Sequence, residues 1–157
     1  MRSAVNTSDE LHAALNDAVA VAFRELAGVE AAARDTCNVS GSEGFADVSA
    51  VLKVTTRAGE GYFVLSFTDH IGTALAKRVL AHSGAEPDAA MVRDCLGEVV
   101  NVVAGQAKTH LSGTPSHFTL GTPLVAAGAP ALDAAERLLV TFASELGEFT
   151  LHVRLPV

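Results

Sequence analysis

Basic residues are few in this sequence, and they are nowhere clustered. Eleven lysines and arginines stand against 18 aspartates and glutamates, which gives a net charge of −7. Proteins that bind nucleic acid or an anionic membrane through a broad surface usually present a basic patch there. We therefore expect neither nucleic acid nor membrane among the partners. A local patch could still meet another acidic protein.

Long apolar runs and closely spaced cysteines are also missing. No apolar run approaches the roughly 20 residues that a membrane-spanning helix needs. Residues 1–10 lack the apolar core of a secretory signal peptide. Cys37 and Cys95 lie far apart, without Cys-x-x-Cys spacing, so two reduced thiols are the expected state. These features predict a cytoplasmic protein.

The histidines show no spacing typical of metal ligands. No two of them form a His-x-x-x-His pair, and no acidic residue falls at a metal-site offset. We expect surface or loop positions for all six, and no metal or cofactor bound by the chain itself. They are His12, His70, His82, His110, His117 and His152.

The composition is that of one globular domain. Apolar residues make up 49% of the 157 residues and charged residues 18%, which is typical of a folded chain with its own core. No linker or low-complexity tract divides the sequence. We predict a single domain over residues 1–157, with residues 1–6 as a flexible N-terminus.

Hydrophobic periodicity predicts three helices and several short strands. A capping box at Thr7–Glu10 opens the first helix, which ends near Gly28. Further helices are expected over 71–83 and 87–112. Strands are expected over 29–39, 47–56, 61–67, 117–120, 137–146 and 148–155, with a turn at 57–60 and an apolar loop over 121–131 rich in proline and glycine.

The element order repeats once along the chain. A helix, a short strand and a hairpin occupy residues 7–67, and the same order returns over 88–155. Element order supports this repeat, whereas residue identities do not. We predict a two-layer α+β fold with pseudo-symmetry between the two halves of the chain, in which long helices pack on one antiparallel-rich β-sheet.

Residues 94–108 combine a strong helical pattern with two polar side chains that we expect to be exposed, and no other segment of the sequence does so. At 100° per residue, with Val99 at the centre of the buried face, Glu98 and Asn101 point outward together. The same arithmetic puts Gly97, Ala104 and Gly105 on the outward side. The inward face would hold Val92, Cys95, Leu96, Val102, Val103 and Gln106.

Two helix-interior glycines need an explanation, because each costs roughly 1 kcal/mol relative to alanine. One interpretation is that Gly105 relieves crowding against a neighbouring element of the same chain. The other is that the small residues make room for a partner's backbone, while Glu98 and Asn101 reach forward. The sequence leaves both open.

The chemistry of this pair suits assistance to another protein's active site. A carboxylate can pair with a partner's lysine or arginine. A carboxamide both donates and accepts hydrogen bonds, so it can orient a water molecule without taking its proton. Neither group is a nucleophile. Together they could position an attacking water, as a glutamine does in GTPases.

The segment Leu96-Gly-Glu-Val-Val-Asn101-Val-Val-Ala-Gly105-Gln-Ala-Lys108 resembles the signature helix of the CheX/CheC/FliY chemotaxis phosphatases. Asp47-Val-Ser-Ala-Val and Gly61-Tyr-Phe-Val-Leu-Ser-Phe resemble that family's central hairpin. Leu120–Gly128 resembles the loop after its second motif strand. The similarity runs from about residue 7 to the end. The first helix has Ala13-Ala-Leu-Asn16 without the glutamate, so one motif is present and the chain resembles CheX.

The resemblance implies a phosphatase that acts on the aspartyl-phosphate of a CheY-like response regulator in two-component chemotaxis signalling. Asn101 would align the attacking water, and Glu98 would pair with the regulator's lysine. The Mg²⁺ ion would belong to the regulator, and the chain would form a homodimer through its sheet. The expected partner-binding residues are Asp94, Gly97, Ala104, Gly105 and Lys108.

A second hypothesis is a non-enzymatic CheX-like module that binds a receiver domain or another signalling protein without hydrolysis. This would follow if a dimer partner or the predicted loop at 121–128 blocked the Glu98 face. A purely structural protein is a third interpretation, but it leaves the exposed glutamate and asparagine unexplained.

Overall fold

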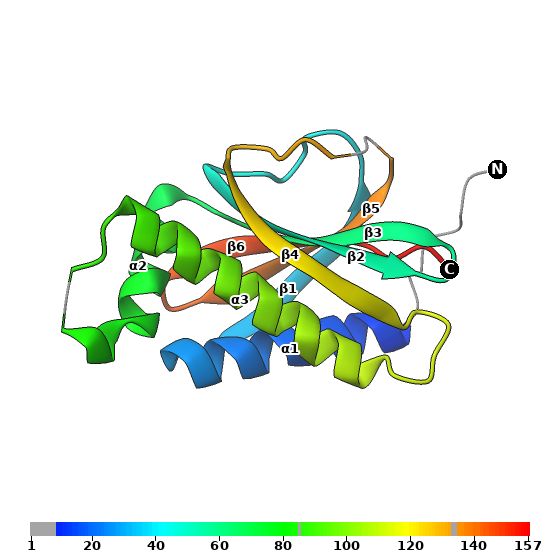
Figure 1. The fold of residues 1–157 in the computed structure, drawn as a ribbon, viewed down its shortest axis with the longest axis horizontal. Coiled ribbons are helices and arrows are strands. Elements are labelled where there is room, and N and C mark those ends of the chain that lie inside the picture. Colours follow the sequence, from blue (N-terminus) through cyan, green and yellow to red (C-terminus); the bar gives the residue numbers. More distant parts are fainter. Residues whose placement is uncertain (1–8, 85, 133–134) are drawn as a thin grey trace.

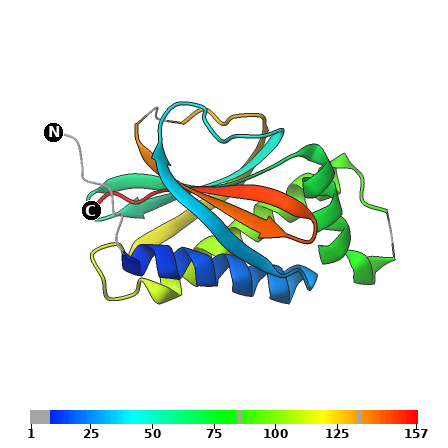
Figure 2. The same cartoon turned by 180° about the vertical axis from the view of Figure 1, so that it is seen from behind.

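A computed structural model of the chain, which describes residues 9–84, 86–132 and 135–157, has two layers. Six antiparallel strands form one sheet, and helices α1 and α3 lie side by side against one of its faces (Figures 1 and 2). The predicted α+β class is confirmed. The elements are α1 (Asp9–Ala27), β1 (Ala31–Val39), β2 (Val48–Thr56), β3 (Gly59–Phe67), α2 (Asp69–Val79), the 3₁₀ turn η1 (Ala81–Ser83), α3 (Ala89–His110), β4 (Phe118–Ala127), β5 (Arg137–Ser144) and β6 (Gly147–Arg154).

The strand order explains the repeat of elements seen in the sequence. The sheet reads β1-β5-β6-β3-β2-β4. Each single strand, β1 or β4, therefore pairs with the hairpin of the other half, while β3 and β6 meet at the centre. The two halves are interleaved rather than placed next to each other, and neither has a complete sheet of its own.

Helices α1 and α3 also agree residue by residue. When Asn16 is placed on Asn101, Ala13 coincides with Glu98, and the glycines that follow the two helices, Gly28 and Gly113, both have positive φ. The aligned residues that are buried in both helices are Leu11 with Leu96, Ala14 with Val99, Leu15 with Val100, Ala18 with Val103, Val19 with Ala104, and Ala22 with Ala107. The structure thus extends along both helices the register in which Ala13–Asn16 of the first helix stands in the place of the motif.

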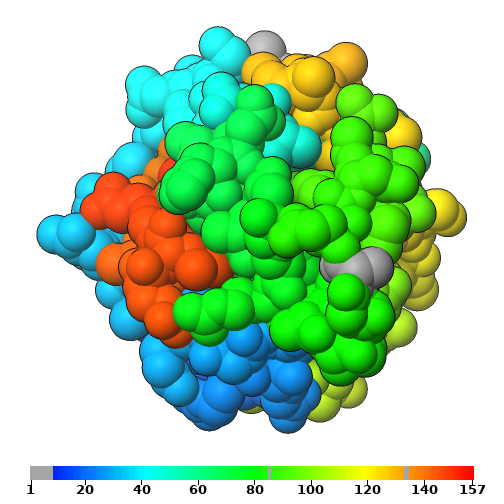
Figure 3. Space-filling view, turned by 90° about the vertical axis from the view of Figure 1, so that its left-hand side faces the viewer, coloured from blue at the N-terminus to red at the C-terminus, as the bar shows by residue number. Residues whose placement is uncertain are grey.

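Helix α2 closes one end of the two-layer core. Figure 3 shows it between α1 and the tip of the β5–β6 hairpin. Leu75 is buried, and the hairpin turn presses on Ile71, since a Cβ atom at Gly147 would lie 2.7 Å from Cδ1 of Ile71. The predicted helix over 71–83 is confirmed in part, because the α-helix begins at Asp69 after a Thr68 cap and its last turn is the separate η1. The predicted capping box includes residues outside those that the structure describes.

The predicted loop over 121–131 is wrong for most of its length. Strand β4 continues through the expected strand end to Ala127 and pairs with β2 on both sides of one break in register. Proline is tolerated in edge strands, where one side needs no ladder hydrogen bond, and β4 is an edge. A bulge opposite Lys53 absorbs the irregularity there, and a Cβ atom at Gly121 would lie 2.7 Å from the Lys53 carbonyl oxygen. Proline and glycine therefore mark a bulged edge strand here.

Two histidines depart from the predicted surface positions: His12 on α1 is only partly exposed, with its Nε2 atom buried, and His152 departs completely. His152 on β6 is fully buried on the sheet face away from the helices. Its Nδ1 accepts a hydrogen bond of 2.9 Å from Nε of Arg137, which is also buried. The Arg137 guanidinium further donates to the carbonyl oxygens of Gly41 and Glu43 and stacks on Phe45. His152 is therefore buried as the hydrogen-bond acceptor of Arg137, whose guanidinium also binds the 41–45 loop.

Candidate functional site

Helix α3 carries Glu98 and Asn101 on its open side. The helix begins after Asp88, whose Oδ1 accepts a hydrogen bond of 2.9 Å from the backbone N–H of Met91. Glu98 is exposed, and Asn101, one turn further, is partly exposed. No hydrogen bond or ion pair between the described residues engages either side chain. Both remain available to an outside group.

The predicted outward placement of Gly97 and Ala104 is wrong. Both residues are buried, and a Cβ atom at Gly97 would lie 3.4 Å from Cβ of Pro123 and 3.7 Å from Cγ2 of Val125. Helix α3 packs on α1, α2, β2 and β4 at once. Its buried arc is therefore wider than a single central stripe, and it extends to the small residues that let β4 approach. Val102 and Gln106, predicted to face inward, are correspondingly only partly buried.

The other residues expected to contact a partner lie on the open side. Asp94 is exposed, while Gly105 and Lys108 are partly exposed. A Cβ atom at Gly105 would meet nothing within 4 Å. The interpretation that Gly105 relieves crowding within the chain is therefore wrong, and the space in front of it is free.

The open side of α3 is negatively charged around Glu98. Asp94 and Glu98 are four residues apart, which places two carboxylates on adjacent turns of one helix face. Neither has an ion-pair partner among the described residues. Burial raises the pKa of the Cys95 thiol, and the nearby Glu98 charge raises it further. Cys95 is thus held as a thiol, and the accessible polar groups around it are Asp94, Glu98 and Asn101.

A groove of about 400 Å³ lies between α3 and β4, and Glu98 is one of the residues that line it. Sequence reasoning missed β4 as its second wall, because the Thr-Pro-Leu-Val stretch has the composition of a loop. It also missed Arg93, which precedes the motif by one turn. The lining residues are Arg93, Asp94, Gly97, Glu98, Pro123, Leu124 and Val125.

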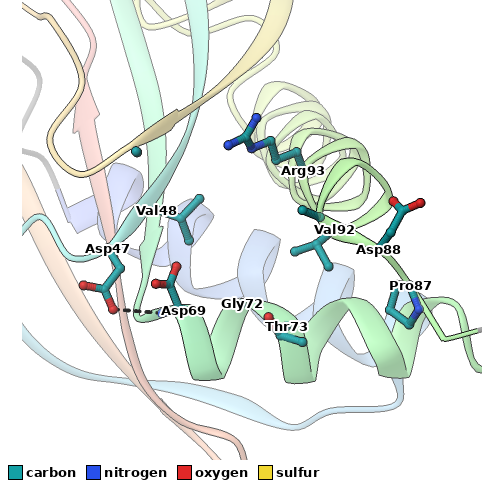
Figure 4. A pocket seen from close by; sticks show the side chains of 11 residues that line it. Asp47, Val48, Asp69, Gly72, Thr73, Pro87, Asp88, Val92 and Arg93 are labelled. Carbon is teal, nitrogen blue, oxygen red and sulfur yellow. Dashed lines mark hydrogen bonds between the residues drawn. The ribbon is translucent and has the colours of Figure 1, made fainter.

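A second hollow of about 380 Å³ adjoins the groove at Arg93. It lies between the first turns of α2 and α3 and the ends of β2 and β4 (Figure 4). On its far side, Asp47 accepts a hydrogen bond of 2.9 Å from the backbone N–H of Asp69. The Arg93 side chain extends from α3 towards the strands (Figure 4), and it forms no hydrogen bond or ion pair with any described residue. The Arg93 guanidinium therefore borders both the groove and the second hollow, and it is available to bind a partner.

The described residues contain no group of three or more histidine, cysteine, aspartate or glutamate side chains placed to hold a metal ion. Both cysteines, Cys37 and Cys95, are free thiols. Within the described part of the chain, no helix is long and apolar enough to cross a membrane.

Comparison with known proteins identifies the relatives of this fold. The family model described as chemotaxis phosphatase CheX matches residues 48–143. The structure is similar to CheX from Desulfovibrio desulfuricans, at 25% identity and a TM-score of 0.81 over 93% of this chain and 99% of that one. It is similar to a putative chemotaxis protein from Desulfovibrio vulgaris Hildenborough, at 25% identity and a TM-score of 0.80 over 96% and 98%.

The fold also matches a CheX–CheY–BeF₃–Mg²⁺ complex from Borrelia burgdorferi, at 18% identity and a TM-score of 0.71 over 94% of this chain and 98% of that one. A search of curated proteins finds no match to this sequence.

Proposed function

Because the chain belongs to the CheX family of chemotaxis phosphatases, we propose that it dephosphorylates the aspartyl-phosphate of a CheY-like response regulator. The observation that carries the proposal is the pair formed by Glu98 and Asn101. They are one turn apart on the open side of α3, and neither has a hydrogen-bond partner within the described chain. The receiver domain would supply the rest of the reaction centre.

Asn101 has the role of positioning water. Its carboxamide oxygen accepts a hydrogen bond from the water while the phosphoryl group receives the attack. The water oxygen forms a bond to phosphorus as the bond from phosphorus to the aspartyl oxygen breaks in line. The products are a free aspartate and inorganic phosphate. Because the carboxamide takes up no proton, the water proton passes to the phosphate.

Glu98 has the role of holding the receiver domain in register. Its carboxylate, together with Asp94, forms a negative surface suited to a lysine of the receiver. Gly105 and Lys108 extend the contact surface along the open side of α3. Gly97 and Ala104, which are buried, would act indirectly by letting β4 lie close to the helix.

The metal ion of the reaction would belong to the receiver. A Mg²⁺ ion accompanies CheY in the Borrelia burgdorferi complex, and we propose the same source here. The ion would neutralise charge on the phosphoryl oxygens. Glu98 and Asn101 would then complete a site whose nucleophile is water and whose metal is the substrate's own.

We also propose a homodimer. The sheet has two edge strands, β1 and β4, and each pairs with one neighbour only among the described strands. We assign the dimer contact to β1, at the end of the sheet opposite to β4 and the groove beside Glu98, because such an edge can pair with another chain. Light scattering of the purified chain should give twice the monomer mass, and a concentration-independent monomer would contradict the proposal.

The experiment that tests the function mixes the chain with a phosphorylated receiver domain and follows the phosphoryl group over time. A shortened phosphoryl lifetime at catalytic amounts of the chain is the expected result. Saturable binding without a change in lifetime would instead support the non-enzymatic module. One ground for that alternative would be coverage of the motif by residues 121–128. They do not cover Glu98, because this segment is mostly strand β4 and Glu98 is exposed beside it.

A further inference from the structure

The largest exposed apolar side chain near the motif is Leu124 on β4. It is 68% exposed, against 37% for Leu120 and 43% for Val157, the other large apolar residues exposed in the described chain. Leu124 also lines the groove to which Glu98 belongs. An exposed leucine needs no explanation by itself, but this one lines the same groove as Glu98, whose side chain has no hydrogen-bond or ion-pair partner among the described residues.

The position of Leu124 follows from the register of β4. It lies opposite Val51 on β2, and Val51 belongs to a small apolar cluster separate from the main core. The Leu124 side chain therefore stands on the sheet face away from the helices, at the edge formed by β4. A partner seated on Glu98 that reaches across this edge would meet Leu124 next.

Arg93 marks the other end of the same surface. It lines both the groove and the neighbouring hollow, and it lies beside Asp94, which leaves a positive group next to a negative one. Apolar contacts flanked by charges of both signs are the arrangement that gives a docking surface both affinity and orientation.

We propose that the receiver domain docks across α3 and over the free edge of β4, with Leu124 and Arg93 as its two anchors. The proposal rests on the function given above and names the surface through which the same site recognises its partner. Leu124 would take an apolar side chain of the receiver, and Arg93 would pair with a carboxylate beside the phosphorylation site. Continuity with Glu98 identifies the occupant, because Glu98 lines the groove itself.

The test measures binding and hydrolysis separately. The Kd of a receiver domain activated with beryllofluoride is measured by titration, and kcat and KM are measured with the phosphorylated receiver. Leu124→Ser and Arg93→Gln should each raise Kd and KM about tenfold, the effect of losing a side chain central to an interface, with kcat within about twofold. Val157→Ser and Arg57→Gln, at exposed positions outside the groove, are the matched controls and should behave as the wild type.

Three results would overturn the docking proposal. The first is an unchanged Kd and KM in both variants while the wild-type chain binds the receiver. The second is a shift in oligomeric state, measured by light scattering, without a change in Kd, because Leu124 would then face a second copy of the chain. The third is no receiver binding by the wild type. Binding that depends on Leu124 without hydrolysis would contradict the proposed function but keep the docking surface.

Discussion

Glu98 can be changed without disturbing the core, since it is exposed and forms no contact that another described side chain needs. Its proposed role is electrostatic, so removing its charge should weaken receiver binding more than it slows the hydrolysis step. Glu98 differs in this respect from Asn101, whose proposed role is in the hydrolysis step.

Replacing Glu98 with glutamine keeps the shape of the side chain and removes its charge. We expect KM for the phosphorylated receiver to rise about tenfold, in the range measured for a close charge pair at an interface, with a smaller change in kcat. The wild-type KM should also rise with ionic strength more steeply than that of the variant, because salt screens the pair. Glu25→Gln, at an exposed position on α1, is the control. Equal KM and equal salt dependence in Glu98→Gln would contradict the assigned role.

A second residue-scale feature is the neutral histidine inside the fold. Burial, together with the charge of Arg137, lowers the pKa of His152 from 6.5 to about 3, although a backbone hydrogen bond with Gly44 opposes this. Nδ1 accepts from Arg137 and Nε2 lies 3.0 Å from Oγ1 of Thr150. The neutral ring therefore carries its proton on Nε2, which donates to Thr150.

This histidine makes stability depend on pH. The pKa is lower in the folded than in the unfolded chain, so the unfolded chain takes up a proton first as the pH falls below about 6.5. The His152 contribution is complete above that pH and declines as the pH falls towards 3. From pH 6.5 to 4.5 the free energy of unfolding should fall by about 2–3 kcal/mol from this group. Denaturant titrations at both pH values measure the change.

The matched variants separate His152 from the other titrating groups. His152→Gln can still accept from Arg137, and it should lose most of that pH-dependent decrease. His82→Gln, at an exposed position, should keep it. A wild-type decrease that persists unchanged in His152→Gln would assign the pH dependence to other groups.

At the scale of elements, α3 meets other parts of the fold on most of its circumference, and its two glycines differ accordingly. Gly97 abuts β4, whereas Gly105 faces open space. The first glycine serves the packing of the chain. Gly105 lowers helix stability relative to alanine and makes room for no other element of the chain.

Substituting the two glycines should have opposite effects on stability. Gly105→Ala should raise the free energy of unfolding by about 0.5–1 kcal/mol, because alanine is the better helix former and has free space. Gly97→Leu should lower it by about 1–3 kcal/mol, since the larger side chain has to push α3 from β4. Thermal unfolding measures both.

Gly105→Ala also tests the contact with a partner. If the receiver's backbone approaches this position, the more stable variant should have a higher KM than the wild type. An unchanged KM would remove Gly105 from the contact surface and leave its presence without a functional reason.

Prediction from sequence worked best where periodicity was strong. The apolar stripes of α1 and α3, the β-branched and aromatic residues of β2 and β3, and the alternation in β6 placed these elements with small errors at their ends. Prediction failed at β4, because proline and glycine are as typical of a loop as of a bulged edge strand. Only the pairing with β2 distinguishes the two, and pairing is a tertiary property.

The whole molecule explains why part of the site could not be predicted. The motif pair lies on one helix, so helical periodicity alone brought Glu98 and Asn101 together. The groove depends on β4 crossing beside α3, and this arrangement arises from the interleaving of the two halves. The buried state of Gly97 and Ala104 has the same origin. Local patterns identify the chemistry of the motif, whereas the surface around it is a product of topology.

The central claim concerns Asn101, and the most direct measurement is the phosphoryl lifetime of the receiver with the Asn101→Ala variant. The account predicts that acceleration falls by about 10²–10³-fold, the scale for losing one preorganised group in the transition state. The Kd for the beryllofluoride-activated receiver and the Tm should stay close to the wild-type values, because the side chain leaves the core untouched. Dephosphorylation at the wild-type rate by this folded, receiver-binding variant would contradict the claim.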